Sequence, residues 1–138
     1  MSELVRLSLS IEKPLLDRLE KLVKRSGYTN RSEFVRDMVR QRLVEREWEE
    51  DQEVVGTITL VYDHHASGLT EKLTDAQHHH HQVILTTTHV HLDRDLCVEV
   101  ILVKGRPREI TSLADTLRRY KGVLHAGLSA STTGAHLR

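Results

Sequence analysis

Cysteine, proline and aromatic residues are scarce in this 138-residue sequence, and aromatic residues make up only 4% of it. One cysteine, Cys97, excludes an intramolecular disulfide framework and is typical of the reducing cytoplasm. The longest apolar runs are too short to cross a bilayer, and the N-terminus lacks the pattern of a secretion signal. We therefore expect a cytoplasmic protein without membrane contact and with a modest aliphatic core, in one domain or two small ones.

The formal net charge of the sequence is zero, but its charged residues are unevenly distributed along the chain. Residues 1–42 carry ten Lys and Arg against six Asp and Glu, whereas residues 43–53 carry six acids and one Arg. A basic first third followed by an acidic joint favours a nucleic-acid partner for the first third.

The first third contains three expected elements. Residues 5–11 alternate in polarity, as in a half-buried strand. A helix follows over residues 14–26, begun by Pro14 and ended by Gly27, and Asn30 with Glu33 marks the start of a second helix. So short a unit gives its lone strand no second layer and is close to the ~40-residue limit for independent folding. We expect residues 1–48 to form a dimeric domain in which two strands pair.

Pairing of these strands would place a row of polar side chains where a two-stranded ribbon enters the major groove of DNA. The amide-rich start of the second helix is suited to binding phosphate. The alternative is an ordinary solvent face, which we consider less favoured because the lone strand needs a partner. The expected DNA contacts are Arg6, Ser8, Ser10, Asn30, Arg31 and Ser32.

An acidic linker at residues 49–53 leads to a second domain, 54–131, and then to a tail, 132–138, that is expected to fray. The second domain has the order β-α-β-β-α-β, typical of a ferredoxin-like fold. The chain is therefore expected to be α+β. The predicted elements are strand 54–62, helix 66–81, strands 83–92 and 96–103, a helix from Pro107 to Gly122, and strand 123–130.

Histidine is in excess, with ten residues, and several lie at the spacing of metal ligands. His89 and His91 are two apart in a predicted strand, so their imidazoles leave the same face. A turn at residues 93–95 returns the chain and brings Cys97 within reach of that face. His78 could supply a fourth ligand, from the same chain or from a neighbouring subunit.

Imidazole and thiolate ligands suit Zn, Cu, Ni or Co and exclude Mg and Ca as the intended ion. Glu99 lies on the same strand face as Cys97. It could act as a general base beside a catalytic zinc, but its favoured role is to accept a hydrogen bond from a ligating histidine. The common nucleotide-binding, nucleophile-elbow and zinc-protease motifs are missing, so we expect neither an enzyme nor a small-molecule substrate.

Both halves resemble the nickel-responsive transcriptional regulators of the NikR type. The first half is similar to their ribbon-helix-helix domain in V-R-L-S-L-S-I and G-Y-T-N-R-S-E-F-V-R-D. The second half is similar to their ACT-like domain in Q-H-H-H-H, T-H-V-H and D-L-C-V-E. The spacing of His78, His89, His91 and Cys97 matches the family's ligand pattern, and the resemblance covers the chain except its termini.

The resemblance implies a homotetramer, or dimer of dimers, that binds a palindromic operator and represses nickel-uptake genes when nickel raises its affinity for DNA. It implies one square-planar Ni(II) per subunit, held by His89, His91 and Cys97 of one chain and His78 of another. Cu(II), Co(II) or Zn(II) could occupy such a site in vitro. Arg6, Ser8 and Ser10 would contact the bases. Glu33 and Asp37 match acids that hold a second cation in some members.

Two other functions are compatible with parts of the pattern. A small metal-binding enzyme or metal store with incidental DNA affinity predicts an open coordination site and no operator. An antitoxin-like ribbon-helix-helix protein predicts a protein partner and indifference to metal.

Overall fold

The computed structural model describes residues 3–138 and divides into two compact units. One unit holds the chain up to Leu43 together with His136–Arg138, and the other holds Val44–Ala135. The boundary between the compact units lies inside helix α2, Arg31–Glu49, and the predicted domain bounds of 1–48 and 54–131 stay a prediction. The chain therefore passes between the units within a continuous helix.

Two helices form the regular part of the first unit. α1 spans Lys13–Arg25 and has Pro14 in its first turn. Gly27 follows the helix in a left-handed conformation, with a φ of 75°, and so ends it. Asn30 caps α2 as predicted, because its side-chain oxygen accepts the Glu33 backbone N–H at 2.9 Å. The rings of Tyr28 and Phe34 pack edge to face, with centroids 5.4 Å apart.

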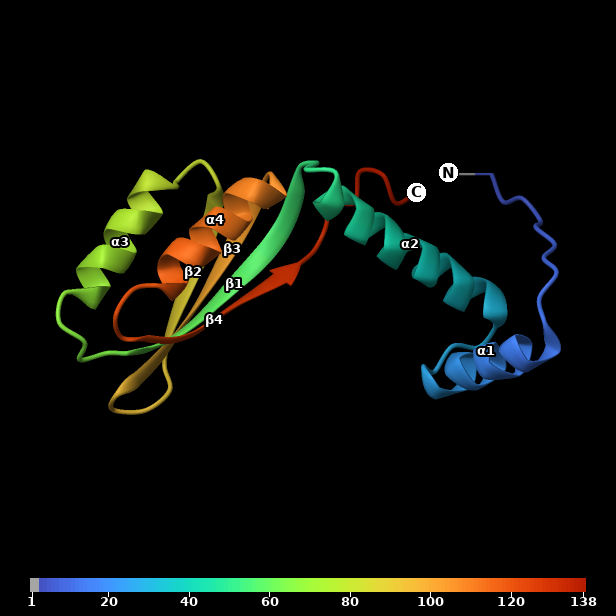
Figure 1. Cartoon of the computed structure of the whole chain (residues 1–138), viewed down its shortest axis with the longest axis horizontal. Coiled ribbons are helices and arrows are strands. Elements are labelled where there is room, and N and C mark those ends of the chain that lie inside the picture. The colour runs from blue at the N-terminus through green and yellow to red at the C-terminus, as the bar shows by residue number, and fades with distance from the viewer. Residues whose placement is uncertain (1–2) are drawn as a thin grey trace. The chain divides into compact units, whose positions relative to one another are not determined.

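Residues 3–12 form no helix or strand in the single chain, and Figure 1 draws them as an irregular trace. Leu7 and Leu9 are 83% and 74% exposed. A strand is defined by hydrogen bonds to a partner strand, and one copy of this segment has none available. Strand 5–11 is therefore not seen in the single chain, and its formation by pairing of two chains stays a prediction.

The second unit is an antiparallel sheet with two helices on one face (Figure 1), and it confirms the predicted βαββαβ order. The spatial strand order is β2-β3-β1-β4. α3 begins later than predicted, after Gly68 in a left-handed conformation with a φ of 71°. The elements are β1 Val54–Asp63, α3 Leu69–His79, β2 Ile84–His91, β3 Leu96–Gly105, α4 Pro107–Arg118 and β4 Val123–Ala130.

The core lies between the sheet and its helices. Every second residue of β1 is buried, including Ile58, Leu60 and Tyr62, while the residues between them are partly exposed. Ile110 and Leu113 of α4 are fully buried in the same cluster. The period-2 and helical patterns of the sequence are thus used to build one apolar layer.

The start of the C-terminal tail is hydrogen-bonded within the second unit. Ser131 N–H donates to the Val55 carbonyl at 2.9 Å, and the Thr132 hydroxyl donates to Glu47 at 2.8 Å. These small polar residues therefore act as hydrogen-bonding groups, and fraying of residues 132–138 stays a prediction.

Asp51 joins the end of α2 to the start of α4. Its carboxylate accepts the Arg108 backbone N–H at 3.2 Å and the Arg108 guanidinium at 3.0 Å. The backbone N–H of Arg108 is the main cause that lowers the pKa of Asp51, and the Arg108 and Arg106 guanidinium groups add to it. A lowered pKa means that the interaction stabilises the fold above the ordinary aspartate range and is lost as pH falls through the folded-state pKa.

We expect Asp51→Asn to lower the urea midpoint of unfolding at neutral pH. The difference in midpoint between the variant and the original protein should shrink when the pH falls below 3.8, the ordinary pKa of an aspartate. Asparagine tolerates the φ of 54° at this position, so the substitution removes charge without adding backbone strain. Urea titrations at several pH values measure the effect. The control is Asp75→Asn, because Asp75 is an exposed aspartate on α3. An unchanged midpoint at neutral pH would contradict the prediction.

Among residues 3–138, no helix combines the length and the apolar character that a membrane span requires.

Candidate metal centre

Cys97 lies in the core beneath the end of the sheet, where three strands meet. It is opposite Tyr62 of β1 and opposite His91 of β2 in the strand register. Directly opposed residues share a face, so the three side chains lie together. The Cys97 Sγ is 3.3 Å from His91 Nδ1, and its side chain is fully buried. The structure therefore brings together two of the predicted ligands.

His89 lies beside this pair but is held by a different partner. Its ring centroid is 5.0 Å from that of His91, and its Nδ1 is 3.0 Å from the Tyr62 hydroxyl. Burial, helped by the negative charges of Glu99 and Cys97, raises the pKa of Tyr62 to about 12. When Nδ1 donates to the phenol oxygen, Nε2 keeps its lone pair, which is the form that ligates a metal. Tyr62 can therefore orient a predicted ligand.

His64 is a potential ligand that the sequence analysis missed. Its Nδ1 is 3.6 Å from Cys97 Sγ, and its ring centroid is 5.1 Å from that of His91. In the described part of the chain, His64, His91 and Cys97 are the one group of three such side chains whose donor atoms all lie within 4.8 Å. His64 follows Tyr62 at a spacing of two, a signal that becomes useful only once β1 is known to pair with β3.

His78 stands in the last turn of α3, is exposed, and does not belong to this group of three. The Nδ1 atoms of the next three histidines lie 2.7, 2.8 and 3.0 Å from backbone carbonyls. A carbonyl only accepts, so each Nδ1 carries the proton and each neutral ring offers Nε2 as a lone pair. The histidine run thus presents nitrogen donors at the end of α3.

Glu99 is a buried carboxylate beside the predicted ligands. It lies opposite His89 in the strand register and is 7% exposed. Gln77 Nε2 donates to its Oε1 at 3.1 Å, and the Thr87 hydroxyl donates to the Gln77 carbonyl at 3.2 Å. Its Oε2 has no partner among the described residues. A buried acceptor left unpaired is costly, so this oxygen is suited to accept a histidine N–H.

The donor set fits a borderline transition-metal ion. A thiol and imidazoles converge at the end of the sheet, and carboxylates, which hard cations prefer, are not among the converging donors. Burial raises the pKa of the Cys97 thiol, with smaller contributions from Asp93 and Glu99. A ligating metal must therefore displace a proton that the protein environment favours.

The residues expected to contact DNA lie in the first unit. Arg6, Ser8 and Ser10 are exposed along the N-terminal segment. Arg31 forms an ion pair with Glu20 at 3.3 Å, and the Asn30 side chain caps α2. The Asn30 side chain thus already has a structural role, whereas Ser32 is exposed at the helix start.

Glu33 and Asp37, the predicted second cation ligands, are engaged with protein groups. Asp37 accepts the Tyr28 hydroxyl at 2.5 Å and Arg40 at 3.0 Å. The Tyr28 hydrogen bond is the main cause that lowers the pKa of Asp37. Glu33 lies 3.5 Å from the Thr29 hydroxyl. A cation at this pair would have to displace these partners.

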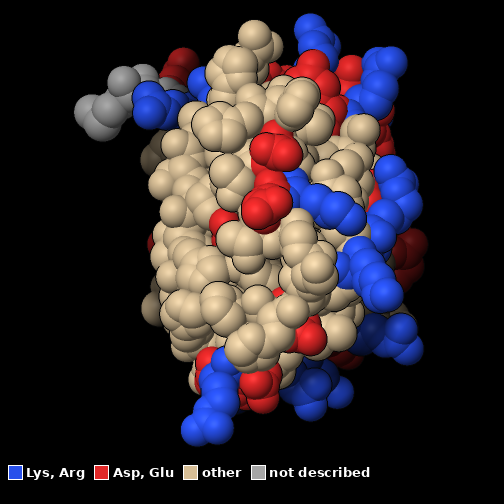
Figure 2. Space-filling view, turned by 90° about the vertical axis from the view of Figure 1, so that its left-hand side faces the viewer, with Lys and Arg blue, Asp and Glu red and all other residues tan. Residues whose placement is uncertain are grey.

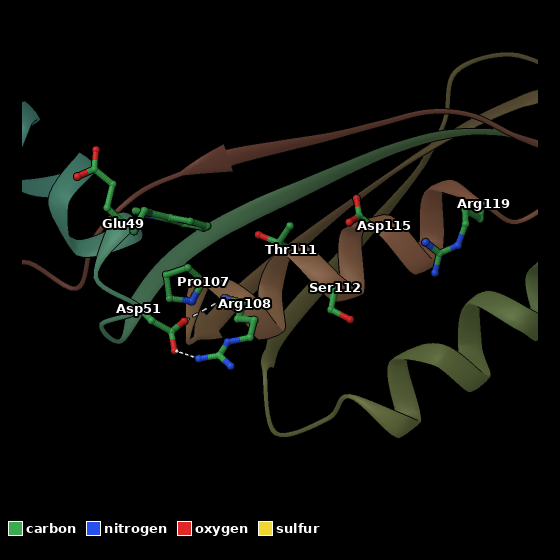
Figure 3. A pocket seen from close by; sticks show the side chains of 9 residues that line it. Glu49, Asp51, Pro107, Arg108, Thr111, Ser112, Asp115 and Arg119 are labelled. Carbon is green, nitrogen blue, oxygen red and sulfur yellow. Dashed lines mark hydrogen bonds and ion pairs between the residues drawn. The ribbon is translucent and has the colours of Figure 1, made fainter.

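An open groove of about 660 Å³ lies over the outer side of α4 (Figure 3). Its lining includes Trp48, Thr111 and Asp115, and the Asp51–Arg108 ion pair lies at its edge. It contains neither histidine nor cysteine, so it shares no residue with the metal centre.

Comparison with known families gives a match to each unit of the chain. Residues 55–131 match the family described as the NikR C terminal nickel binding domain. Residues 5–46 match the family described as ribbon-helix-helix protein, copG family. These assignments confirm the two domain types that the sequence predicted.

Several relatives match this chain over nearly its whole length. A protein of Solibacter usitatus is 50% identical over 100% of both chains. One from Syntrophus aciditrophicus is 48% identical over 97% of this chain and 98% of its own. One from Geobacter sulfurreducens is 48% identical over 99% of each. All three bear the name "Putative nickel-responsive regulator".

A solved structure resembles part of the fold of this chain. The uncharacterized protein TM1266 from Thermotoga maritima superposes with a TM-score of 0.53 at 14% identity, covering 57% of this chain and 98% of that one. The matches to both domain families and to full-length relatives lead to one conclusion. The chain belongs to the family of nickel-responsive regulators.

Proposed function

We propose that this protein is a DNA-binding repressor of nickel-uptake genes whose affinity for a palindromic operator rises when Ni(II) binds the second unit. The observation that carries the proposal is the approach of buried Cys97 to His91, 3.3 Å apart, in a chain that also has a ribbon-helix-helix domain. A thiol and imidazole pair is a binding site for a transition metal, and the first domain is the type that contacts DNA.

The proposed ligands are His89, His91 and Cys97 of one subunit and His78 of another, with one ion per subunit. Two observations support the proposal that neighbouring side chains orient these ligands. Tyr62 lies 3.0 Å from His89 Nδ1, and Glu99 has a buried oxygen without a partner. Both can accept an imidazole N–H and so hold a ring in the ligating orientation.

A homotetramer is the proposed assembly. Figure 2 views the molecule from the side on which α3 lies in Figure 1, and most of that face is neither acidic nor basic. Leu85 and Leu92, near the two ends of β2, are each 56% exposed. In the first unit Leu22, Val39 and Leu43 are exposed as well, which supports strand pairing that buries helix faces in a dimer.

In the proposed mechanism the chain links the two functions through its own residues. Arg6, Ser8 and Ser10 contact base edges, while the start of α2 at Arg31 and Ser32 meets phosphate. Histidines and a thiolate of different subunits would hold the nickel ion, which would supply a coordination link between those subunits. Metal shifts DNA affinity only by the difference in its own binding to the two conformations.

The test is a DNA-binding titration of the full chain with Ni, Cu, Zn and Co, using a palindromic duplex selected from a random library. We expect nickel to tighten binding by about 5- to 150-fold, the usual range of allosteric coupling. Absorption spectra in the same titration report a thiolate–metal band. DNA affinity that is indifferent to every metal would overturn the proposal and favour an antitoxin-like role.

His64 offers an alternative ligand, and a matched pair of variants separates it from His89. We expect His89→Ala to abolish the nickel response and His64→Ala to retain it. The reverse result would assign the nickel site to the group of His64, His91 and Cys97 that converges in the single chain.

A further inference from the structure

The last turn of α2 is attached to the sheet through Trp48. The indole N–H donates to the Ser131 carbonyl at 2.9 Å, and Ser131 in turn donates its N–H to the Val55 carbonyl of β1 at 2.9 Å. The indole ring covers Gly56, where a Cβ would lie 3.3 Å from the ring. Ser131 therefore extends the β-sheet pairing and holds the helix at the same time.

Glu47 makes a second attachment in the same turn. It is 4% exposed, and its Oε1 accepts the Thr132 hydroxyl at 2.8 Å. Gly134 N–H donates to the Thr132 oxygen at 3.0 Å, which leaves the hydroxyl proton for Glu47. The other oxygen, Oε2, has no partner among the described residues. A buried carboxylate with a single donor depends strongly on that donor.

These attachments fix a helix that belongs to both units. α2 runs unbroken from Arg31 to Glu49, and the unit boundary falls between Leu43 and Val44. The tail crosses back after Ala135, and within the first unit Arg40 Nε donates to the Leu137 carbonyl at 3.3 Å. The tail thus meets α2 at Trp48, then Glu47, then Arg40, in that order along its length.

We propose that Glu47, Trp48 and Thr132 are positioning residues that lock the C-terminal turn of α2 to the metal-binding domain, and that the nickel-dependent gain in DNA affinity depends on this attachment. The inference rests on the proposed function for its readout. α2 is the segment that continues from this turn into the DNA-binding unit, so loosening of the turn would weaken the link between the two domains.

A looser attachment of the last turn of α2 to the metal-binding domain should change one measurable quantity. It reduces the difference in DNA affinity between the metal-bound and metal-free protein, which is the coupling between the two sites. It leaves the affinity for nickel itself nearly unchanged, because Glu47, Trp48 and Thr132 are not among the metal-centre residues. A residue needed only for folding would alter both quantities or neither.

The test compares Thr132→Val, which keeps the shape and removes the hydroxyl, with Thr132→Ser, which keeps the hydroxyl. Nickel affinity and the nickel-dependent gain in affinity for the selected palindromic duplex are measured on the full chain. We expect Thr132→Val to reduce that gain by between about 2-fold and 30-fold. Nickel affinity should be unchanged, and Thr132→Ser should behave as the original protein.

Trp48 is the one tryptophan of the chain, so acrylamide quenching of its fluorescence reports the attachment directly. We expect stronger quenching in Thr132→Val than in Thr132→Ser, with or without nickel. A full nickel gain together with unchanged quenching in Thr132→Val would overturn the proposal. If the original protein shows no nickel gain, the proposed function fails, and the quenching comparison still decides whether Thr132 holds the joint.

A second variant covers the case in which Thr132→Val does not fold. Trp48→Phe keeps an aromatic ring over Gly56 and removes the N–H that bonds Ser131. We expect the same loss of nickel gain with unchanged nickel affinity. A Trp48→Phe protein with the full gain would overturn the proposal.

Discussion

Mixing a His78→Ala chain with a Cys97→Ala chain is expected to restore nickel-dependent DNA binding that neither chain shows alone. This is the expected result if the proposed site takes Cys97 from one subunit and His78 from another. A tetramer assembled from equal amounts of both chains then contains complete sites, about a quarter of the total by random mixing. Loss of the thiolate or of the fourth ligand in each chain alone should abolish the nickel response, which removes the whole expected gain in DNA affinity of about 5- to 150-fold.

The mixing experiment requires co-unfolding and refolding so that subunits exchange, followed by nickel and DNA titration. His79→Ala mixed with Cys97→Ala is the matched control, because His79 is adjacent on α3 and bonds the Asp75 carbonyl through Nδ1. The His79→Ala chain alone should respond to nickel normally. No recovery in the His78→Ala and Cys97→Ala mixture would place His78 in the same chain as Cys97 or remove it from the site.

Gly122→Ala is expected to destabilise the second unit by about 3 kcal/mol, since both strain and overlap act at this position. Gly122 has a φ of 101°, which L-residues rarely adopt, and an added Cβ would lie 2.4 Å from Ala66 Cβ. Its carbonyl also accepts the Asp63 N–H at 2.9 Å. Ala66 follows His64 and His65 in the same loop, so relief of the overlap would also displace His64.

Urea unfolding monitored by circular dichroism measures the loss of stability. The variant Gly134→Ala separates the contribution of backbone strain from that of the overlap with Ala66. Gly134 also has a positive φ, 80°, but a Cβ there meets nothing within 4 Å. Gly134→Ala should therefore cost only the backbone strain, of about 1 kcal/mol. Equal losses in the two variants would show that the Ala66 overlap is relieved at no cost.

The periodicity of the sequence was enough to predict most of the fold. Alternation in residues 54–62 predicted a strand with one buried face, and Pro107 and Gly122 bounded a helix with an apolar stripe. The domain order and the capping of α2 by Asn30 were predicted in the same way, since these features depend on residues close together in the chain. The hydrogen bonds between the end of α2 and the start of the tail were not predicted, because they join residues more than eighty positions apart, as with Trp48 and Ser131.

The metal centre likewise has features that local sequence determines and features that depend on the pairing of distant strands. The sequence by itself determined that His89 and His91 leave one face of a strand and that Cys97 returns beside them, because a hairpin fixes these relations locally. Only the tertiary structure decided that β1 pairs with β3, which sets Tyr62 opposite Cys97 and carries His64 to within 3.6 Å of its sulfur. Strand pairing across distant segments depends on burial of the whole sheet, and residue spacing within one strand does not encode it.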